Sequence, residues 1–288
     1  MRVRALLGDY PETAALKQGK IASDRLTFDF AAYSPPHTGF KAMVREQAFD
    51  ISEMAIVSYL IARSHNKPMV LLPAVVMGRF QHDYAIYNVS RGAMTPSDLA
   101  GKRVGIRSFT TTTGAWMRGI LANDYGVDLD QVNWITFEEP HVAEYQDRTE
   151  RAPAGRTIIQ MLIDGELDAV IGDKSSDARL KPLFADPEKE AEAWYSKHGI
   201  APLNHLVVAC EGFVRSHPDL VREFFRMLKA SKDAAAKPAA GGIDFTPLGV
   251  EAMRKPLEYI IRYAIQQELI PRPVTVDELF EDVTRELA

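Results

Sequence analysis

The run of residues 95–121 constrains the fold of this chain more than any other, because it predicts a strand, a turn and a helix in direct succession. Its sequence is TPSDLAGKRVGIRSFTTTTGAWMRGIL. Pro96–Asp98 predicts a short helical turn that ends at Gly101, and Arg103–Arg107 alternates briefly with β-branched residues, as a strand does. Apolar residues at helical spacing then predict a helix over 112–124. A strand that leads through a turn into a helix is typical of α/β proteins.

The start of this predicted helix has the chemistry of an anion site. The first four amides of a helix have no partner inside the helix, and the helix dipole places partial positive charge there. The hydroxyls of Thr110, Thr111, Thr112 and Thr113, with Arg107 just before them, add donors that suit a carboxylate or a phosphate. The same threonines are equally compatible with an ordinary N-cap on a surface helix. Local chemistry leaves both interpretations open.

Strand and helix patterns alternate along the rest of the chain. Strands are predicted at 3–7, 26–32, 51–53, 69–76, 84–88, 104–106, 134–137, 169–171 and 206–209. Helices are predicted between many of them, at 38–46, 52–63, 112–124, 156–164 and 218–232. This order predicts an α/β fold with mainly parallel sheets. With 288 residues and 46% hydrophobic content, two lobes are a better expectation than one.

The composition excludes several classes of function. A net charge of −5 with scattered basic residues gives no electrostatic footprint for nucleic acid. The longest apolar run, Pro68–Met77, is too short to span a membrane. The single cysteine, Cys210, excludes an internal disulfide and leaves too few thiolates for a structural zinc site. The first residues reach charge and a turn too early for a secretory signal, so we expect a cytoplasmic protein.

Two capping boxes are predicted in the C-terminal part of the chain. Ser216 with Asp219 would begin the helix predicted at 218–232. Thr275 with Glu278 repeats this signature for a last short helix.

Several segments carry a resemblance to a known family. They are FDISEM at 49–54 with SYL at 58–60, RFQH at 79–82, DLAGKRVG at 98–105, WMRG at 116–119, GELDAV at 165–170 and NHLVV at 204–208. The DLAGKRVG and GELDAV segments resemble many solute-binding proteins of the type II periplasmic-binding-protein scaffold. Within that scaffold, the SEM, RFQH and NH segments resemble the 4,5-dihydroxyphthalate decarboxylase family. The similarity spans roughly residues 1–235.

The resemblance implies an α/β fold of two lobes, each with a mixed sheet flanked by helices, joined by two crossover strands. Lobe one would comprise 1–86 plus 206–288 and lobe two 87–205. The ligand would lie in a cleft between the lobes, at strand ends and helix starts. The sequence departs from the family pattern at Gln81, where a second arginine is usual, and at 107–110, where RSFT replaces a Pro-Glu-Tyr-Gln-like stretch.

The reaction that this family implies requires a particular set of groups. CO2 leaves an aromatic acid when the ring carbon that carries the carboxylate is protonated, so an acid must lie over the ring. A second group takes the phenolic proton, cations or helix starts hold the carboxylates, and no organic cofactor is required. His82 and His205 are the acid candidates, because imidazole titrates nearest to neutral pH. Glu53 would be the base or the partner that fixes a histidine tautomer.

The remaining candidates would bind the substrate. Arg79 can make a two-pronged contact with a carboxylate that lysine cannot match, and Ser52 and Asp9 would lie at strand ends. Ordinary alternatives exist: the histidines as hydrogen-bonded residues at strand ends, Glu53 as a first-turn helix carboxylate, Arg79 as an exposed arginine, and Asp9 as part of a Gly-Asp-Tyr-Pro turn. Trp116 is expected in the core, because it is spaced with Ile120 on a helical face.

No metal site is predicted, because none of the histidines at 37, 65, 82, 141, 198, 205 and 217 has ligand-like spacing to another. A second relative of the scaffold, the thiamine-pyrimidine synthase group, uses a cysteine-rich motif that a chain with only Cys210 cannot have.

Two functions therefore compete. The first is a cytoplasmic, cofactor-independent decarboxylase of an aromatic acid. The second is a solute-binding protein that captures a small carboxylate or other anion for a transporter. A ligand-sensing or other lyase relative on the same scaffold is a third, weaker alternative. In each case the expected partner is a small molecule, an aromatic carboxylate for the enzyme, with no nucleic acid or membrane partner. A homo-oligomer is compatible with the sequence, although no segment encodes an interface.

Overall fold

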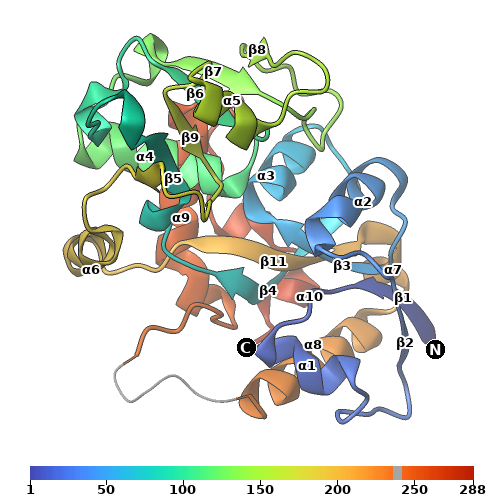
Figure 1. Ribbon diagram of the computed structural model, residues 1–288. Coiled ribbons are helices and arrows are strands. Elements are labelled where there is room, and N and C mark those ends of the chain that lie inside the picture. The colour runs from blue at the N-terminus through green and yellow to red at the C-terminus, as the bar shows by residue number, and fades with distance from the viewer. Residues whose placement is uncertain (236–241) are drawn as a thin grey trace. The chain divides into compact units, whose positions relative to one another are not determined.

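The computed structural model describes residues 1–235 and 242–288, which form two compact units (Figure 1). The first unit comprises Met1–Arg79, Leu203–Ile261 and Ile270–Ala288, and the second comprises Phe80–Pro202 and Arg262–Leu269. Each unit contains one mixed sheet flanked by helices, which confirms the predicted α/β class with two mixed sheets. Within the described ranges, no helix is long and apolar enough to cross a membrane.

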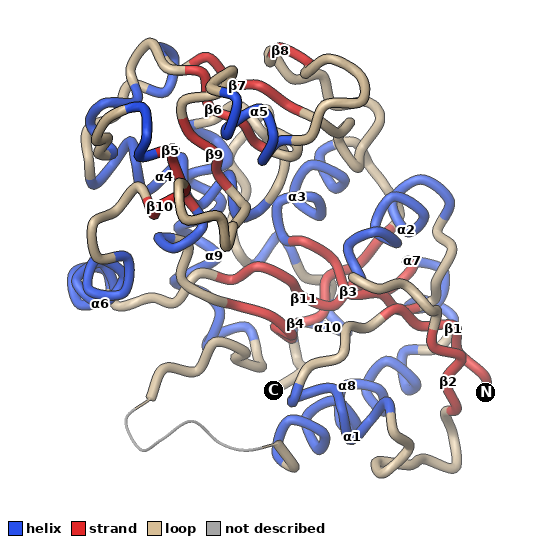
Figure 2. Tube along the Cα trace, in the orientation of Figure 1, coloured by secondary structure: helices blue, strands red, loops and turns tan. Residues whose placement is uncertain are grey.

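The sheet of the first unit has the strand order β2-β1-β3-β11-β4 (Figure 2). Its strands are β1 (Arg2–Leu6), β2 (Thr27–Phe30), β3 (Ile51–Ala55), β4 (Met69–Gly78) and β11 (Leu203–Cys210). Its helices are α1 (Pro11–Lys17), α2 (Phe40–Glu46), α3 (Ile56–Ser64), α7 (Glu211–Ser216), α8 (Pro218–Asp233), most of α9 (Val250–Gln266) and α10 (Asp282–Arg285). Strand β1 pairs in parallel with β2 and β3, whereas β11 runs antiparallel to β3 and β4.

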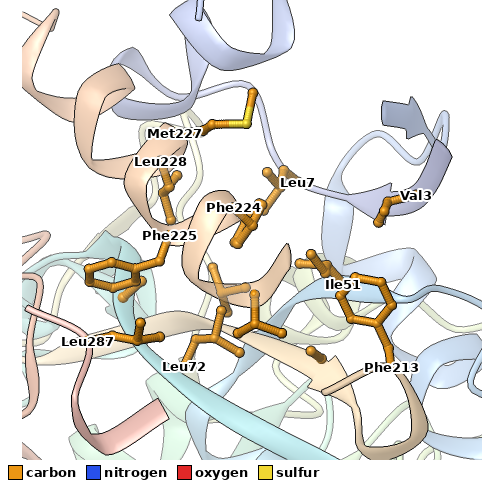
Figure 3. Close-up of a cluster of buried hydrophobic side chains, with 14 of the residues drawn as sticks. Val3, Leu7, Ile51, Leu72, Phe213, Phe224, Phe225, Met227, Leu228 and Leu287 are labelled. Carbon is orange, nitrogen blue, oxygen red and sulfur yellow. The ribbon is translucent and has the colours of Figure 1, made fainter. Parts of the chain in front are cut away.

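The core of the first unit packs helix α8 against the sheet (Figure 3). Val3 and Ile51, from β1 and β3, share one buried cluster with Phe224 and Leu228 of α8. Apolar residues recur every three or four positions along α8, so they form a single stripe that faces the sheet. Burying each side chain of this size stabilises the fold by about 1.5–3 kcal/mol. This core holds β1 and β3, whose ends carry the candidate site described below.

The sheet of the second unit has the order β10-β5-β9-β6-β7-β8. Its strands are β5 (Ala85–Asn88), β6 (Arg103–Ile106), β7 (Asn133–Thr136), β8 (Glu150–Arg151), β9 (Ala169–Ile171) and β10 (Leu180–Pro182), and its helices are α4 (Thr112–Asp124), α5 (Ile158–Asp164) and α6 (Pro187–His198). Ala169 and Ile171 join one buried cluster with Met117 of α4, whereas Val170 joins another with Met161 of α5. Because successive strand residues face opposite sides, α4 and α5 cover opposite faces of this sheet.

Helix α4 also packs against residues 262–269 of the second unit. Trp116 is fully buried and meets the Tyr263 ring edge-on, with 5.7 Å between ring centroids, so its expected place in the core is confirmed. Arg118 Nε donates to Gln267 Oε1 at 2.8 Å, and Gln267 Nε2 donates to the Ala115 carbonyl at 2.8 Å. Complete burial lowers the pKa of Arg118 to about 9. These contacts explain why the end of α9 is grouped with the second unit.

The unit boundaries differ from the expected ones at 86/87 and 205/206. The chain leaves the first unit after Arg79, because β4 ends at Gly78 and β5 pairs with β9 and β10 of the second sheet. It returns at Leu203, because β11 pairs with β3 and β4 from its first residue onward. Residues 262–269 also belong to the second unit, although the residues before and after them belong to the first. The sequence pattern did not predict this additional passage of the chain between the units.

Individual elements agree with the predictions more closely than the boundaries do. All nine predicted strands are present, with ends shifted by at most three residues. The helix predicted from residue 52 was wrong at its start, because β3 continues to Ala55 and α3 begins only at Ile56. The Ser216 cap was also wrong, because Ser216 is the last residue of α7 and His217 precedes Pro218 without a side-chain cap.

The second predicted capping box is confirmed. Glu278 Oε2 accepts hydrogen bonds from the Thr275 amide at 2.6 Å and from the Thr275 hydroxyl at 2.9 Å, and the Glu278 amide donates back to Thr275 Oγ1.

Candidate active site

Two side chains and one backbone amide meet at the Glu53 carboxylate in the first unit. Oε1 accepts a hydrogen bond from the Tyr10 hydroxyl at 2.6 Å and lies 2.6 Å from His205 Nδ1. Oε2 accepts a hydrogen bond from the Gly8 amide at 2.6 Å. The Glu53 side chain is fully buried, whereas 14% of the His205 side chain is exposed. A buried carboxylate with bonds to both oxygens has its orientation determined by its neighbours.

The sheet brings Glu53 and His205 together. In the antiparallel pair β3–β11, Val207 lies opposite Glu53 and His205 lies opposite Ala55. Glu53 and His205 are therefore diagonal neighbours on one face of the sheet, within reach of long side chains. The register between β11 and β4 shifts on both sides of His205, which marks a bulge. Bulges re-aim side chains and are common beside active sites.

The turn after β1 brings Gly8 and Tyr10 to the same place, because β1 runs parallel to β3. Thr13 holds this turn: its hydroxyl donates to the Gly8 carbonyl at 2.7 Å, and its oxygen accepts from the Tyr10 amide at 3.1 Å. A Cβ at Gly8 would lie only 2.5 Å from a Tyr10 ring atom. Glycine at this position therefore lets the Tyr10 ring fold back toward Glu53.

The electrostatics of the cluster keep Tyr10 protonated. Burial raises the pKa of Tyr10 far above its ordinary value, and the charge of Glu53 and the hydrogen bond to it act in the same direction. Arg79 lowers the pKa of Tyr10, so its guanidinium exerts its field on this cluster. Arg79 Nη1 also contacts Met77 Sδ at 3.9 Å. Tyr10 is therefore a hydrogen-bond donor to Glu53 at neutral pH and cannot serve as a base.

The contact with Glu53 determines which nitrogen of His205 is available for chemistry. An ionised carboxylate only accepts hydrogen bonds, so we infer that His205 Nδ1 carries the proton that faces Glu53. In the part of the chain that the structure describes, this is the only hydrogen bond of the ring. The Phe40 ring packs edge-on against it, with 5.2 Å between centroids. An imidazole held in this way can give or take a proton at Nε2.

His82 has a buried, aromatic environment. It belongs to the second unit, where its ring lies 5.1 Å from that of Phe184 and 6.3 Å from that of Trp194. It is 1% exposed, and neither ring nitrogen has a hydrogen-bond partner among the described residues. Burial lowers the pKa of His82 to about 4, so the ring is neutral at pH 7. The acid role expected for His82 stays a prediction.

Ser52 and Asp9 lie in the first unit but direct their side chains elsewhere. The Ser52 hydroxyl is buried and donates to the backbone carbonyl of Glu53 at 2.6 Å. Asp9 forms an ion pair with Lys17 at 2.5 Å, and 88% of its side chain is exposed. Neither side chain contacts the Glu53 carboxylate in the structure, so their expected roles in binding stay predictions.

The threonine turn, residues 110–113, lies in the second unit at the start of α4. Thr111 is the N-cap residue, but its hydroxyl donates to the Ser108 carbonyl at 3.0 Å instead of capping the helix. Arg107 lies 3.8 Å from Glu138 in an ion pair. The anion site predicted at this turn stays a prediction.

Tyr10 and Gly8 are candidate site residues that were not selected from the sequence, where only Asp9 of this turn was chosen. The available signal was the Gly-Asp-Tyr-Pro turn directly after the first strand. Among residues 1–235 and 242–288, no group of three or more His, Cys, Asp and Glu side chains is arranged to hold a metal ion.

Solved structures identify the class of fold. The periplasmic aliphatic sulphonate binding protein SsuA of Escherichia coli matches with a TM-score of 0.60 at 10% identity, over 97% of each chain. The desulfurization enzyme DSZB matches with a TM-score of 0.56 at 14% identity, over 98% of this chain and 97% of its own. The chain therefore has the two-lobed α/β fold of periplasmic-binding proteins. Because a binding protein and an enzyme share it, the fold alone does not decide the function.

Sequence comparison identifies the family. The family model described as NMT1/THI5 like matches residues 29–240, more than half of the chain, so the chain belongs to the NMT1/THI5-like family. A relative named 4,5-dihydroxyphthalate decarboxylase from Comamonas testosteroni is 28% identical over 251 residues, which cover 82% of this chain and 76% of the relative. A relative of the same name from Pseudomonas putida is 28% identical over 205 residues, covering 66% and 79%. These relatives confirm the resemblance seen in the SEM, RFQH and NH segments.

Proposed function

We propose that this chain is a carboxy-lyase that removes CO2 from a hydroxylated aromatic carboxylate of the 4,5-dihydroxyphthalate kind. The names of the two relatives at 28% identity support this reaction class. The observation that carries the proposal is the contact of 2.6 Å between the buried Glu53 carboxylate and His205 Nδ1. The carboxylate holds Nδ1 and favours the imidazolium form, in which Nε2 of this partly exposed histidine carries a proton that it can donate.

The proposed step transfers one proton to carbon. His205 Nε2–H gives its proton to the ring carbon that bears the carboxylate, and a hydroxyl para to that carbon supports the positive charge that develops. The bond to the carboxylate then breaks, its electron pair restores the aromatic ring, and CO2 leaves. Nε2 regains a proton from solvent, so one carboxylate and one proton become one arene and one CO2. A positioned acid of this kind contributes about 10²–10⁴-fold to the rate.

Glu53 acts in this proposal as the partner that orients the histidine. It is fully buried, and both of its oxygens accept hydrogen bonds, which leaves it poorly placed to take a proton from a substrate hydroxyl. Its negative charge stabilises the imidazolium form of His205 before the proton is transferred. The proposed step uses no organic cofactor.

Arg79 is the substrate-binding residue that we propose for this unit. Its guanidinium already exerts its field on Tyr10, next to Glu53. A planar guanidinium can hold a carboxylate with two parallel charge-assisted hydrogen bonds. An ortho-dicarboxylate offers a second carboxylate that stays on the ring, so one can be held while the other is lost.

Capture of a small anion without chemistry is the second candidate function. The likeness to the E. coli sulphonate binding protein, with its TM-score of 0.60, favours it. A binding protein needs donors and cations, but it does not need a histidine whose proton is governed by a buried carboxylate. The Glu53–His205 pair therefore favours the enzyme.

The experiment that separates the two functions is incubation of the purified protein with 4,5-dihydroxyphthalate and related hydroxylated benzoates. CO2 release is measured together with the aromatic product by chromatography, and calorimetry measures binding of the same compounds. We expect release of CO2 and a product with one carboxylate fewer, with none from heat-denatured protein. Tight binding of these compounds without any product would contradict the lyase and support the binding protein.

A further inference from the structure

Tyr10 occupies a position that the proposed step does not use. Its hydroxyl and His205 Nδ1 both approach the same carboxylate oxygen, Glu53 Oε1, at 2.6 Å each. The other oxygen, Oε2, is occupied by the Gly8 amide. The Tyr10 hydroxyl and the His205 imidazole therefore share one oxygen of the Glu53 carboxylate.

We propose that Tyr10 is a positioning residue that acts through Glu53 and sets the pH at which the Glu53–His205 pair releases its proton. The inference rests on the proposed role of His205 as the acid. A carboxylate that accepts a second hydrogen bond has less negative charge to offer the imidazolium, so Tyr10 makes His205 a stronger acid than Glu53 alone would allow.

The geometry of the turn suits this role, because Tyr10 cannot easily leave it. Thr13 binds the backbone on both sides of Asp9, through the Gly8 carbonyl and the Tyr10 amide. The ring folds over Gly8, where even one added carbon would collide with it. The hydroxyl is therefore held on Glu53 before any substrate binds.

Other charged groups around the pair do not depend on the Tyr10 hydroxyl. Among the described residues, Glu53, Arg79 and Asp9 are the charged side chains that shift the pKa of Tyr10. Phe40, from α2, contributes only a ring edge to His205. Replacing Tyr10 by phenylalanine keeps all of these groups and removes one hydrogen bond.

The test is a titration of His205 followed by NMR of the full chain labelled with ¹⁵N in the histidine rings. The His205 signal is assigned by its absence in His205→Gln. We expect Tyr10→Phe to move the midpoint of the His205 titration to higher pH by about 0.5–1 unit, because the pair loses a donor to its carboxylate. If the chain turns over its substrate, the alkaline limb of the pH–rate profile moves by the same amount.

Two further variants complete the test. Gly8→Ala keeps the hydroxyl but displaces the ring, so it should shift the midpoint in the same direction. Tyr59→Phe is the matched control, because it removes a buried hydroxyl in the same unit that donates to the Leu279 carbonyl at 2.9 Å. We expect it to leave the midpoint unchanged.

An unchanged or lowered midpoint in Tyr10→Phe overturns the inference, and so does an equal shift in Tyr59→Phe. The NMR titration needs no turnover. If only the lyase proposal fails, no CO2 is released but Tyr10→Phe still shifts the His205 midpoint. If the Tyr10 proposal fails, the His205 midpoint does not shift in Tyr10→Phe.

Discussion

Glu53 and His205 are 152 residues apart in the sequence, yet Glu53 Oε1 lies 2.6 Å from His205 Nδ1 in the structure. Strands β3 and β11 pair antiparallel and place the two residues diagonally on one sheet face. The carboxylate is completely buried, whereas the ring is 14% exposed. A pair with one buried and one accessible end is suited to pass a proton to a bound molecule.

Replacement of His205 by glutamine should abolish turnover and preserve binding. An acid contributes mainly in the transition state, so kcat should fall by about 10²–10⁴-fold, with the dissociation constant of the substrate changed far less. The measurements are steady-state rates and calorimetric titration with 4,5-dihydroxyphthalate. His65→Gln, at an exposed position of the same unit, is the control and should keep the wild-type rate. A His205→Gln enzyme with the wild-type kcat would remove His205 from the mechanism.

Replacement of Glu53 by glutamine should keep the shape of the site and remove the charge that stabilises the imidazolium. We expect kcat to fall by about 10²-fold, because the imidazole loses its orienting acceptor. Rates are compared with those of Glu46→Gln, an exposed glutamate at the end of α2, which should behave as wild type. Equal rates in Glu53→Gln and Glu46→Gln would show that the carboxylate charge plays no part.

His82 should make the protein less stable at mildly acidic pH. Burial lowers its pKa from 6.5 to about 4 in the folded state. Between these values the unfolded chain binds the proton and the folded chain does not, so this group reduces stability as the pH falls from about 6.5 to about 4. Its full contribution is at most about 3 kcal/mol.

His82→Phe should therefore lose less of its free energy of unfolding than wild type between pH 7 and pH 4.5, as measured by urea denaturation. Phenylalanine suits a site that is bounded by the rings of Phe184 and Trp194. His65→Gln should retain the wild-type pH dependence. The same pH dependence in His82→Phe and wild type would contradict the effect of burial on His82.

Gly119 should be required for the packing of α4 against residues 262–269. A Cβ at this position would lie 2.1 Å from a Tyr263 ring atom. We expect Gly119→Ala to lower the free energy of unfolding by about 1–3 kcal/mol, because ring or helix must move. Gly212→Ala, in helix α7 with open space around its Cβ, should instead be neutral or stabilising by up to about 1 kcal/mol. Equal effects of the two substitutions would contradict the close approach.

Hydrophobic patterns predicted the strands well because most of them are short buried runs bounded by turn residues. Strands β8 and β10 were not predicted. They have two and three residues, which is too short to show a periodic pattern, and they lie at the two edges of their sheet. Helix α9 was not predicted, because Pro256 lies inside it and a proline normally ends a helix. The SEM segment was assigned partly to a helix, because five consecutive buried residues fit either element.

The candidate site could be predicted as a set of residues, but its geometry could not. Glu53 and His205 were both proposed, with Glu53 as a possible partner of a histidine, but their contact depends on the register of β3 and β11. The role of Tyr10 depends on how the turn at Gly8 folds back. The environment of His82 is formed by Phe184 and Trp194, about a hundred residues further on, so the RFQH segment alone could not reveal it.

Carbon-13 NMR of 4,5-dihydroxyphthalate labelled in its carboxylates is the decisive measurement, run in parallel with wild type and His205→Gln. We predict that wild type converts the carboxylate signal into labelled CO2 and bicarbonate, and that His205→Gln at the same concentration does so at least about 10²-fold more slowly. A wild-type protein that binds the compound and leaves both carboxylate signals intact would contradict the proposed function. Equal rates in the two proteins would contradict the assignment of His205 as the acid.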